Sequence, residues 1–278
     1  MITVKLLGGL GNQMFQYAIG RHLAIKNGDA LTLDLSELLK RENINYTPRS
    51  FELDVFDIKC ASKILPGKIQ PLKTRVTLKY LTKKVNENGL AYHANVLALK
   101  GNVYLNGWWQ NEKYFSDIEN VIRKDFTLKP AELPHSEYLR TIRSANSVSV
   151  HFRLGDYVSN PVARAFHGVL PLDYYKNAIK KITEQVPNPH FFIFSDDVDW
   201  VKTNFPFEQD HTFITPGNGN GAVDMHLMSL CKYNIIANSS FSWWGAWLNQ
   251  NPGKIVIAPK KWYNATQTEI IPAQWMQI

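Results

Sequence analysis

The sequence predicts an α/β protein built on parallel sheets, and three observations carry that prediction. Short apolar stretches typical of buried strands alternate along the chain with longer segments of helical periodicity. The chain opens with a strand, a glycine-rich loop and a helix, the order in which nucleotide-type α/β domains begin. The segment Lys129–Pro134 carries two prolines and is typical of a linker. We therefore expect two domains of ordinary size, residues 1–134 and 135–278.

Composition narrows the class of protein. Hydrophobic residues make up 45% of the 278 residues and charged residues 20%, a balance typical of a soluble globular protein. No stretch approaches the roughly 18 apolar residues that a membrane span requires. The first residues form a strand pattern and not a signal peptide. Since Cys60 and Cys231 are the only cysteines, we expect neither a disulfide framework nor a cysteine metal cluster, and a cytoplasmic location fits best.

The net charge of +7 favours anionic partners, which include nucleotides and an anionic membrane face. Most Lys and Arg residues are scattered, so we expect no nucleic-acid partner. The exception is a stretch in which basic residues recur at roughly helical spacing: Lys68, Lys73, Arg75, Lys79, Lys83 and Lys84. These residues form either a solvated helix face or a peripheral contact with the inner face of the membrane or with an acceptor.

The first elements of the chain surround a glycine-rich loop. Ile2–Leu7 has the pattern of a buried strand, the loop lies within Gly8–Ala18, and helical periodicity continues to about Lys26. The dinucleotide fingerprint requires a third glycine that this loop lacks, which makes a phosphate cradle the less favoured interpretation. We expect instead a backbone loop that lines a cleft, with Asn12 and Gln13 as its hydrogen-bonding side chains. Later in this half we expect strands at Leu31–Leu35 and Asn102–Asn106 and a helix over Asn111–Phe126.

The second half is organised around Val148–Ser159. Apolar and polar residues alternate at its start, as in a strand with one apolar face, and this pattern puts His151 and Arg153 on the same face. The strand stops at Gly155, so three groups able to bind an anion or move a proton gather there: His151, Arg153 and Asp156. A guanidinium is a planar fork suited to two phosphate oxygens. The alternative is a surface ion pair of Arg153 with Asp156.

The remaining elements alternate as a parallel sheet requires. We expect strands at His190–Phe194, Thr212–Ile214, Asn234–Ala237 and Lys254–Ala258, and helices at Leu172–Glu184, Val223–Cys231 and Trp243–Asn249. A further helix follows Ser195–Trp200 and extends to Asn204. Three strand ends then point polar groups at one sheet edge, where open α/β sheets bind ligands: residues 151–156, 195–197 and 238–242. Helix capping would explain each segment singly. It does not explain their convergence.

Each group at this edge suits a part of a nucleotide. Arg153 can hold a diphosphate, and Ser239 and Ser240 at a helix start can hold a phosphate oxygen. Asp224, which opens another helix, can accept the N1 and N2 protons of guanine. Asp197 and Asp199 form a D-x-D pattern, in which two carboxylates can hold a metal ion that bridges a diphosphate. Because they stand at a predicted helix start, where acids cap and meet the helix dipole, we expect neither a metal nor another cofactor.

Four motifs carry a resemblance to a known family: G-G-L-G-N-Q-M-F-Q-Y-A at the start, H-F-R-L-G-D-Y in the middle, F-S-D-D, and D-M-H-L-M-S-L-C followed by N-I-I-A-N-S-S-F-S-W-W-G-A-W. In this order and spacing they resemble the bacterial α-1,2-fucosyltransferases of glycosyltransferase family 11, from Leu6 to about Trp262. The central motif is similar to the wider fucosyltransferase pattern H-x-R-R-x-D. Leu154 stands where a second arginine is common, so Arg164, His167 or Ser240 would have to share the phosphate charge.

The resemblance implies a GT-B architecture, in which two Rossmann-like domains face a cleft. The second domain would bind GDP-fucose and the first would help to hold a galactoside acceptor, either an oligosaccharide or a lipid-linked glycan. The reaction implied is transfer of L-fucose from GDP-β-L-fucose to the 2-hydroxyl of a terminal galactoside, with inversion. The rival interpretations are another sugar-nucleotide-dependent transferase on the same fold and a non-catalytic glycan-binding protein.

The resemblance also assigns roles to residues. Arg153 would contact the diphosphate, His151 the nucleotide or ribose, and Asp156 would hold this framework together with the Asp196–Asp197 pair. We expect the catalytic residues to be Arg153, His151 and Asp156. We expect the substrate-binding residues to be Asn12, Gln13, Arg153, Ser195, Asp196, Asp224, Ser239, Ser240 and Phe241. The base that takes the acceptor proton stays open among Asp34, His151, Asp156 and His226.

Overall fold

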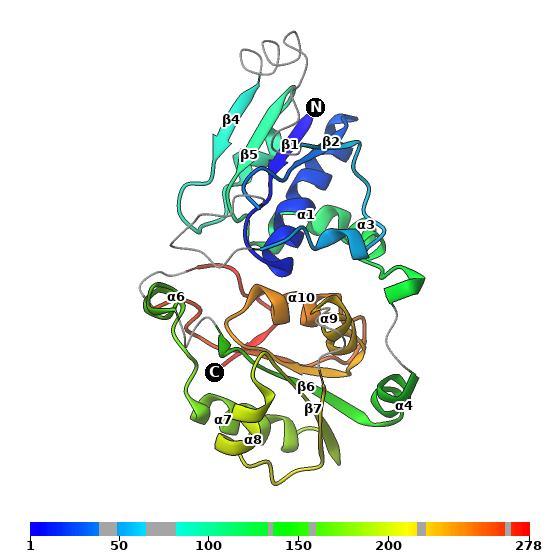
Figure 1. Cartoon of the computed structure of the whole chain (residues 1–278), viewed down its shortest axis with the longest axis vertical. Helices are drawn as coiled ribbons and strands as arrows, with labels where there is room; N and C mark the ends of the chain where they lie inside the picture. The colour runs from blue at the N-terminus through cyan, green and yellow to red at the C-terminus, as the bar shows by residue number, and fades with distance from the viewer. Residues whose placement is uncertain (39–48, 65–81, 133–135, 156–159, 216–220, 265–267) are drawn as a thin grey trace. The chain divides into compact units, whose positions relative to one another are not determined.

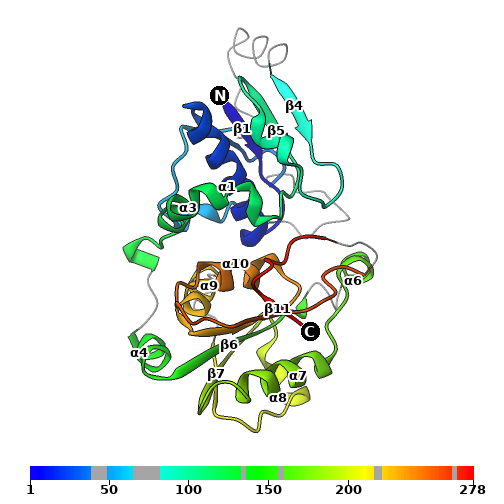
Figure 2. The ribbon, with the colours of Figure 1, turned by 180° about the vertical axis from the view of Figure 1, so that it is seen from behind.

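The computed structural model divides into two compact units, Met1–Lys129 and Pro130–Ile278. It describes residues 1–38, 49–64, 82–132, 136–155, 160–215, 221–264 and 268–278. Each unit contains its own parallel sheet with helices against it (Figures 1 and 2). The predicted α/β fold with parallel sheets is therefore confirmed. The division between the units falls inside the segment Lys129–Pro134 that carries the two prolines.

The first unit is built on a five-stranded sheet with the order β3-β2-β1-β5-β4, and every pair of neighbours is parallel. The strands are β1 Ile2–Lys5, β2 Leu31–Asp34, β3 Ser62–Ile64, β4 Lys83–Asn86 and β5 Val103–Asn106. β1 lies in the middle, between β2 and β5. The segments that follow β1 and β5 therefore leave the sheet side by side at its carboxyl edge.

Helix α1, Leu10–Asn27, follows β1 and packs closely on it. Gly20 makes this approach possible, because a Cβ at this position would lie 2.3 Å from Cγ2 of Val4 and 2.9 Å from Cδ1 of Leu31. The helix ends at Gly28, which has a φ of 64° and donates its N–H to the last turn. The predicted order of strand, glycine-rich loop and helix is thus confirmed. The predicted extent of the loop is wrong, because the helix already begins at Leu10 and includes Asn12 and Gln13.

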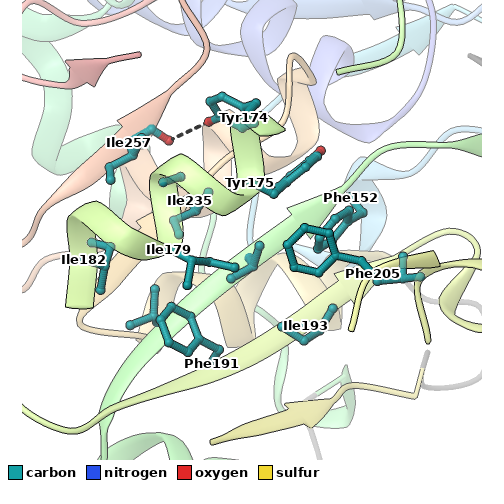
Figure 3. Packing of buried hydrophobic residues seen from close by; sticks show 14 of the residues in the cluster. Phe152, Tyr174, Tyr175, Ile179, Ile182, Phe191, Ile193, Phe205, Ile235 and Ile257 are labelled. Carbon is teal, nitrogen blue, oxygen red and sulfur yellow. Dashed lines mark hydrogen bonds between the residues drawn. The ribbon is translucent and has the colours of Figure 1, made fainter. Parts of the chain in front are cut away.

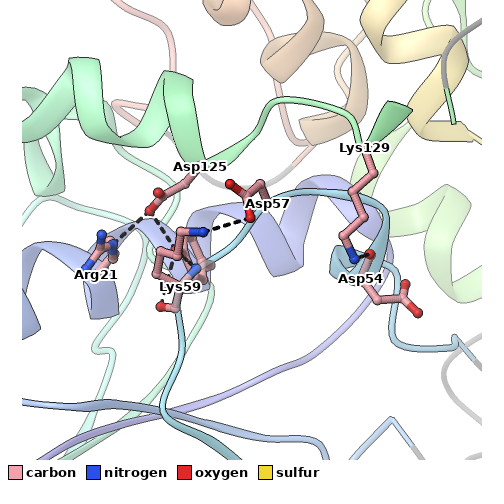
Figure 4. Close-up of polar contacts among 7 residues, drawn as sticks. Arg21, Asp54, Asp57, Lys59, Asp125 and Lys129 are labelled. Carbon is pink, nitrogen blue, oxygen red and sulfur yellow. Dashed lines mark hydrogen bonds and ion pairs between the residues drawn. The ribbon is translucent and has the colours of Figure 1, made fainter. Parts of the chain in front are cut away.

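A buried carboxylate joins α1 to α3, Glu119–Asp125 (Figure 4). Oδ2 of Asp125 accepts hydrogen bonds from the hydroxyl of Tyr17 and from Nε of Arg21, both at 2.7 Å. The Tyr17 hydroxyl in turn accepts the backbone N–H of Lys59 at 2.9 Å. Asp125 is only 3% exposed, so these bonds compensate for the loss of water around its charge.

The segment predicted as one helix over Asn111–Phe126 is instead broken into three pieces. It forms two 3-10 turns, η3 Glu112–Tyr114 and η4 Ser116–Ile118, before α3. Phe115 separates the two turns with a φ of −145°, which no helix tolerates. Its ring is fully buried and lies 6.1 Å from that of Phe15 in α1. Burial of this side chain therefore outweighs helical continuity.

One strand of the first unit, β4, carries little apolar signal. β4 is an edge strand, and three of its four residues are exposed, so its sequence K-K-V-N is mostly polar. Lys83 and Lys84 lie in this strand, and the prediction that they belong to a basic helix face is wrong. The other basic residues of that prediction, Lys68, Lys73, Arg75 and Lys79, lie outside the described residues.

The second unit contains a six-stranded parallel sheet with the order β11-β10-β9-β6-β7-β8. Its strands are β6 Asn146–Phe152, β7 Pro189–Ser195, β8 His211–Phe213, β9 Tyr233–Ile235, β10 Val256–Ala258 and β11 Met276–Gln277. Counted from β6, this is the order 3-2-1-4-5-6 of dinucleotide-binding sheets. The chain reverses direction across the sheet between β8 and β9, which places the topological switch point between β6 and β9.

Helices cover both faces of this sheet. They are α4 Ser136–Ser144, α6 Pro161–His167, α7 Leu172–Thr183, α8 Val198–Asn204, α9 Gly221–Leu230 and α10 Ser240–Leu248. Alternate residues of β7 point to opposite faces. Phe191 and Ile193 join a core cluster with residues of α7, whereas Phe192 and Phe194 join a second cluster with Leu227 of α9. Of these elements, α4, α6 and β11 are not predicted from the sequence.

The larger of these two clusters packs α7 along the sheet, with the first turn of the helix at the carboxyl ends of the strands (Figure 3). The ring of Tyr175 stacks on that of Phe152 at 3.9 Å between centroids. The hydroxyl of Tyr174 donates to the carbonyls of Ile236 at 2.7 Å and Ile257 at 3.3 Å. These two tyrosines fix the positions at which β6, β9 and β10 end. Within the described part of the chain, no helix has the length and apolar character needed to cross a bilayer.

Candidate functional site at the carboxyl edge of the second sheet

The candidate site lies where β6 ends between its two neighbours. β6 pairs in parallel with β7, with Phe152 opposite Ser195, and with β9, with Val150 opposite Ile235. The segments after these three strands therefore share one edge, as the sequence predicts. Ligands of open α/β sheets bind at this edge, beside the switch point.

Arg153 is the first residue after β6, and it pairs with the residue that follows β7. Its Nη1 lies 2.7 Å from Oδ2 of Asp196, and the two side chains are 21% and 26% exposed. The other oxygen of the same carboxylate, Oδ1, accepts the backbone N–H of Leu154 at 2.9 Å. The hydroxyl of Tyr175 hydrogen-bonds to the backbone of Arg153 from the core side. Asp156, the partner that the sequence suggested for Arg153, lies outside the described residues.

His151 stands two residues earlier, on the side of β6 that faces away from α7. It is 5% exposed, and its Nδ1 is buried with no hydrogen-bond partner among the residues the structure describes. Burial, with the charge of Arg153 as a second cause, lowers the pKa of His151 to about 3. His151 is therefore neutral at physiological pH and is a poor candidate for the base. It remains a group that can form a hydrogen bond, because its Nδ1 has no partner in the described part of the chain.

Phe241 links this histidine to α9. Its ring lies 5.5 Å from the ring of His151, and a Cβ on Gly221 would lie 3.2 Å from it. Asp224 follows one turn into α9, where burial raises the pKa of its carboxyl group to about 6. Its Oδ1 is buried and has no hydrogen-bond partner in the described parts of the chain. An unpaired buried polar atom destabilises a fold, so the unmet atoms of His151 and Asp224 mark positions where a ligand would supply bonds.

The helix that follows β9 begins at the same edge. Ser239 caps α10, because its Oγ accepts the N–H of Phe241 at 3.4 Å, and Ser240 is the first helical residue. The helix dipole makes such a start favourable for an anion. The side chain of Asn238 fixes this turn by donating to the carbonyls of His167 at 2.9 Å and Trp262 at 3.2 Å.

Two of the acids that follow β7, Asp197 and Asp199, belong to the start of α8. Oγ of Ser195 accepts the N–H of Asp197 at 3.0 Å, and Oδ1 of Asp197 accepts the N–H of Trp200 at 3.0 Å, which caps the helix. The side chain of Asp199 is 95% exposed and lies 3.6 Å from Nζ of Lys202. In the described residues, no cluster of three or more His, Cys, Asp or Glu side chains is arranged to hold a metal ion.

Two residues predicted to lie in the glycine-rich loop, Asn12 and Gln13, lie instead in the first turn of α1. Gln13 is fully buried, and its amide nitrogen donates to the carbonyls of Gly8 at 2.9 Å and Ser50 at 2.8 Å. Its amide oxygen accepts the N–H of Glu52 at 3.0 Å, so the side chain braces the loop. Oδ1 of Asn12 accepts a hydrogen bond from Nε2 of Gln110, in the segment after β5, at 2.7 Å.

Sequence reasoning missed two features of the site in the second unit. Tyr175 looks like an ordinary core residue of an amphipathic helix, and its bond to the Arg153 backbone depends on how α7 crosses the sheet. The Arg153–Asp196 pair requires the register of β6 with β7, which one sequence does not specify. F-S-D directly after a buried strand was the available signal.

The strand order, the arginine and the helix start at the switch point are typical of nucleotide-binding α/β proteins. The chain belongs to glycosyl transferase family 11, whose family model matches residues 1–278. It is thus a glycosyltransferase with an α/β fold built on two parallel sheets. This membership confirms the resemblance noted in the sequence.

Individual relatives cover almost the whole chain. An alpha-1,2-colitosyltransferase of Escherichia coli is 38% identical over 100% of this chain and 99% of its own length. The O-antigen biosynthesis glycosyltransferase WbnK of Escherichia coli is 36% identical over 93% of both chains. The mouse galactoside 2-alpha-L-fucosyltransferase Sec1 is 25% identical over 89% of this chain and 64% of its own. Among solved structures, NodZ alpha-1,6-fucosyltransferase soaked with GDP-fucose aligns with a TM-score of 0.46 and 16% identity, over 90% of this chain and 96% of that one.

Proposed function

We propose that this glycosyltransferase moves L-fucose from GDP-β-L-fucose to the 2-hydroxyl of a terminal galactoside, and is thus a galactoside 2-alpha-L-fucosyltransferase. The observation that carries the proposal is the position of Arg153 at the switch point of the second sheet, in a chain of family 11. The GDP-sugar would bind to the unit Pro130–Ile278, and the unit Met1–Lys129 would help to hold the acceptor glycan. Two thiols, Cys60 and Cys231, suit a reducing cytoplasm.

The groups around Arg153 match the parts of GDP. The guanidinium would take two diphosphate oxygens, and the start of α10 at Ser240 would take another. Asp224, with its unmet Oδ1, would accept protons of guanine, and Nδ1 of His151 would bond to the nucleoside. The ring of Phe241, which lies beside His151, would contact the nucleoside or the phosphate next to it.

The chemistry is a single displacement. The acceptor oxygen forms a bond to C1 of fucose while the bond from C1 to the diphosphate oxygen breaks, GDP leaves, and the acceptor hydroxyl loses its proton. Negative charge grows on the leaving diphosphate, so the fixed cation of Arg153 stabilises the transition state more than the ground state. Leu154 takes the place of a second arginine and is buried, which leaves Arg153 with the larger part of this task.

The base that takes the acceptor proton contributes less to the rate enhancement than stabilisation of the leaving diphosphate. His151 has a pKa of about 3, and burial also lowers the pKa of His226. The carboxylate of Asp34 already accepts hydrogen bonds from the hydroxyl of Tyr104 at 2.6 Å and from the N–H of Ser36 at 2.9 Å. We assign most of the rate enhancement to stabilisation of the leaving group, which requires no divalent metal.

A second candidate donor differs at one hydroxyl group. Colitose is the 3-deoxy form of L-fucose, and a relative at 38% identity is an alpha-1,2-colitosyltransferase. The GDP part would be held in the same way for both sugars, so only contacts to the sugar ring would choose between them. A site that hydrogen-bonds the 3-hydroxyl would reject the 3-deoxy sugar strongly, because its polar groups would be left unpaired.

The test is an assay with GDP-L-fucose and GDP-colitose as donors and a panel of β-galactosides as acceptors, both free and lipid-linked. The product linkage is assigned by NMR. The proposal expects transfer from GDP-L-fucose with an α-linkage to the 2-hydroxyl of galactose, and no transfer by Arg153→Ala. Transfer from GDP-colitose alone, or to another hydroxyl, would overturn the fucosyl assignment.

A further inference from the structure

We propose that Asp196 is a positioning residue for Arg153, and that Gly155 is a glycine because a side chain there would push the Asp196 carboxylate away. The inference rests on the proposed role of Arg153 in holding the diphosphate. It assigns to two further residues the task of fixing the guanidinium before the donor binds. Neither is required to touch the substrate.

The carboxylate of Asp196 holds the Arg153 loop at two points. Oδ1 accepts the backbone N–H of Leu154 at 2.9 Å, and Oδ2 lies 2.7 Å from Nη1 of Arg153. The same side chain therefore fixes both the backbone after β6 and the head of the arginine. A guanidinium has five N–H donors in one plane, so a carboxylate bound through one nitrogen orients the plane for a second anion.

Gly155 is pressed against this carboxylate. A Cβ built on Gly155 would lie 2.4 Å from Oδ2 of Asp196 and 3.1 Å from its Cγ. Gly155 is not among the described residues with a positive φ, so its backbone conformation is open to alanine. Space beside Asp196 is thus the reason for the glycine. Alanine at this position would displace Oδ2, the oxygen that holds Arg153, and would leave the arginine itself unchanged.

Removal of the Asp196 carboxylate therefore has opposite effects on the affinity for GDP and on the orientation of Arg153. The negative charge of Asp196 repels an anionic diphosphate, so its removal favours GDP in the ground state. The same removal frees the guanidinium to leave the orientation that the transition state needs. Misplacement of a catalytic group by about 1 Å can lower a rate by roughly 10²-fold. The signature of positioning is therefore a loss in kcat without a loss in affinity for GDP.

The experiment compares Asp196→Asn and Gly155→Ala with wild type. Asparagine keeps an oxygen for the Leu154 N–H and removes the charge. The matched control is Asp197→Asn, which removes the same charge from the next residue but keeps a good helix cap. GDP affinity is measured by calorimetry, kcat and KM are measured with the donor and acceptor that the enzyme accepts, and thermal melting checks the fold. Gly155→Ala is also made in the background of Asp196→Ala, which has no Oδ2 to displace.

We expect Asp196→Asn and Gly155→Ala to lower kcat roughly 10- to 100-fold, with GDP affinity unchanged or higher and Asp197→Asn close to wild type. In the Asp196→Ala background, Gly155→Ala should add little, because both changes act on one contact. Wild-type kcat in both single variants would overturn the proposal. The proposal would also be overturned if Gly155→Ala lowered kcat by the same factor in the Asp196→Ala background as in wild type. The role of Arg153 is tested separately: if Arg153→Ala keeps GDP affinity and kcat, the diphosphate role on which this inference rests is at fault, whereas the proposed function fails only if the donor or the linkage differs.

Discussion

The rings of His151 and Phe241 lie 5.5 Å apart and join the two strands that flank the switch point of the second sheet. His151 belongs to β6, and Phe241 lies in the first turn of α10, which follows β9. The contact removes the imidazole from water beside the cation of Arg153, so both causes of its low pKa follow from this position. His151 is thus a neutral, buried group at the candidate site, and its Nδ1 has no hydrogen-bond partner within the described parts of the chain.

The low pKa of His151 predicts that the fold loses stability as the pH is lowered. The ordinary pKa of histidine is 6.5 and that of His151 is about 3, so the unfolded chain takes up a proton first as the pH falls. The stability from neutral His151 is therefore full above pH 6.5 and is lost progressively toward pH 3. Urea unfolding at pH 7.5 and 4.5 should show a smaller acid loss for His151→Gln than for wild type. His211→Gln, at an exposed histidine, is the control, and an equal loss in all three proteins would contradict the prediction.

Asp224 predicts a pH-dependent affinity for GDP. A carboxyl group accepts both the N1 and the N2 proton of guanine only when it is ionised, and burial raises the pKa of Asp224 to about 6. Affinity for GDP should therefore fall as the pH is lowered through about 6, and Asp224→Asn should bind weakly with little pH dependence. Calorimetry with IDP, which lacks the 2-amino group, gives the control. Wild type should prefer GDP and Asp224→Asn should not; the same preference in both would remove Asp224 from the guanine site.

Activity should not require a divalent metal. Asp197 caps α8 and Asp199 is exposed beside Lys202, so neither acid of the D-x-D pattern is poised to bridge a diphosphate. We expect an unchanged initial rate after dialysis against excess chelator. Complete loss of activity that Mn²⁺ or Mg²⁺ restores would assign these two acids as metal ligands instead.

The first unit offers a test of packing. Gly20 lies against Val4, where a Cβ would approach Cγ2 to 2.3 Å, so Gly20→Ala must push α1 away from β1. We expect a loss of about 1–3 kcal/mol in unfolding free energy, since overpacking outweighs the gain in helix propensity. Val4→Ala removes the obstructing methyl groups, and the double variant should be less destabilised than the sum of the two single variants. Additive losses would show that the two residues do not compete for space.

The parts of the fold that the sequence predicts are those with strong periodicity. β6 alternates apolar with polar residues, β7 is a buried run of mostly apolar residues, and α1 and α7 have clear helical patterns and stops. The edge strands β4 and β11 are short and partly exposed, so little hydrophobic signal marks them. α6 escaped prediction as well, because this short helix exposes Val162 and Phe166 and so lacks an apolar face turned inward.

The sequence predicts which segments form the site, but it does not predict which side chains bond to each other there. Polar residues after β6, β7 and β9 must share an edge once the sheet is parallel, and the sequence indicates each of them. The choice of Asp196 as the partner of Arg153 depends on Phe152 standing opposite Ser195. Gln13 is bonded by Ser50 and Glu52 because the chain comes back to α1 at these residues, and Ser50 lies 37 residues after Gln13 in the sequence. Contacts of this range are set by tertiary structure.

Substitution of Arg153 tests the central claim most directly, with kcat, KM and GDP affinity measured for Arg153→Ala and Arg153→Lys. Loss of one preorganised donor costs roughly 10²–10³ in rate, and a charged donor with no second arginine beside it should cost at least as much. We predict that Arg153→Ala is folded, binds GDP weakly and is almost inactive, and that Arg153→Lys recovers little, because lysine lacks the planar fork. A kcat within a few-fold of wild type, together with a much lower melting temperature, would contradict this account and leave Arg153 as a structural ion pair with Asp196.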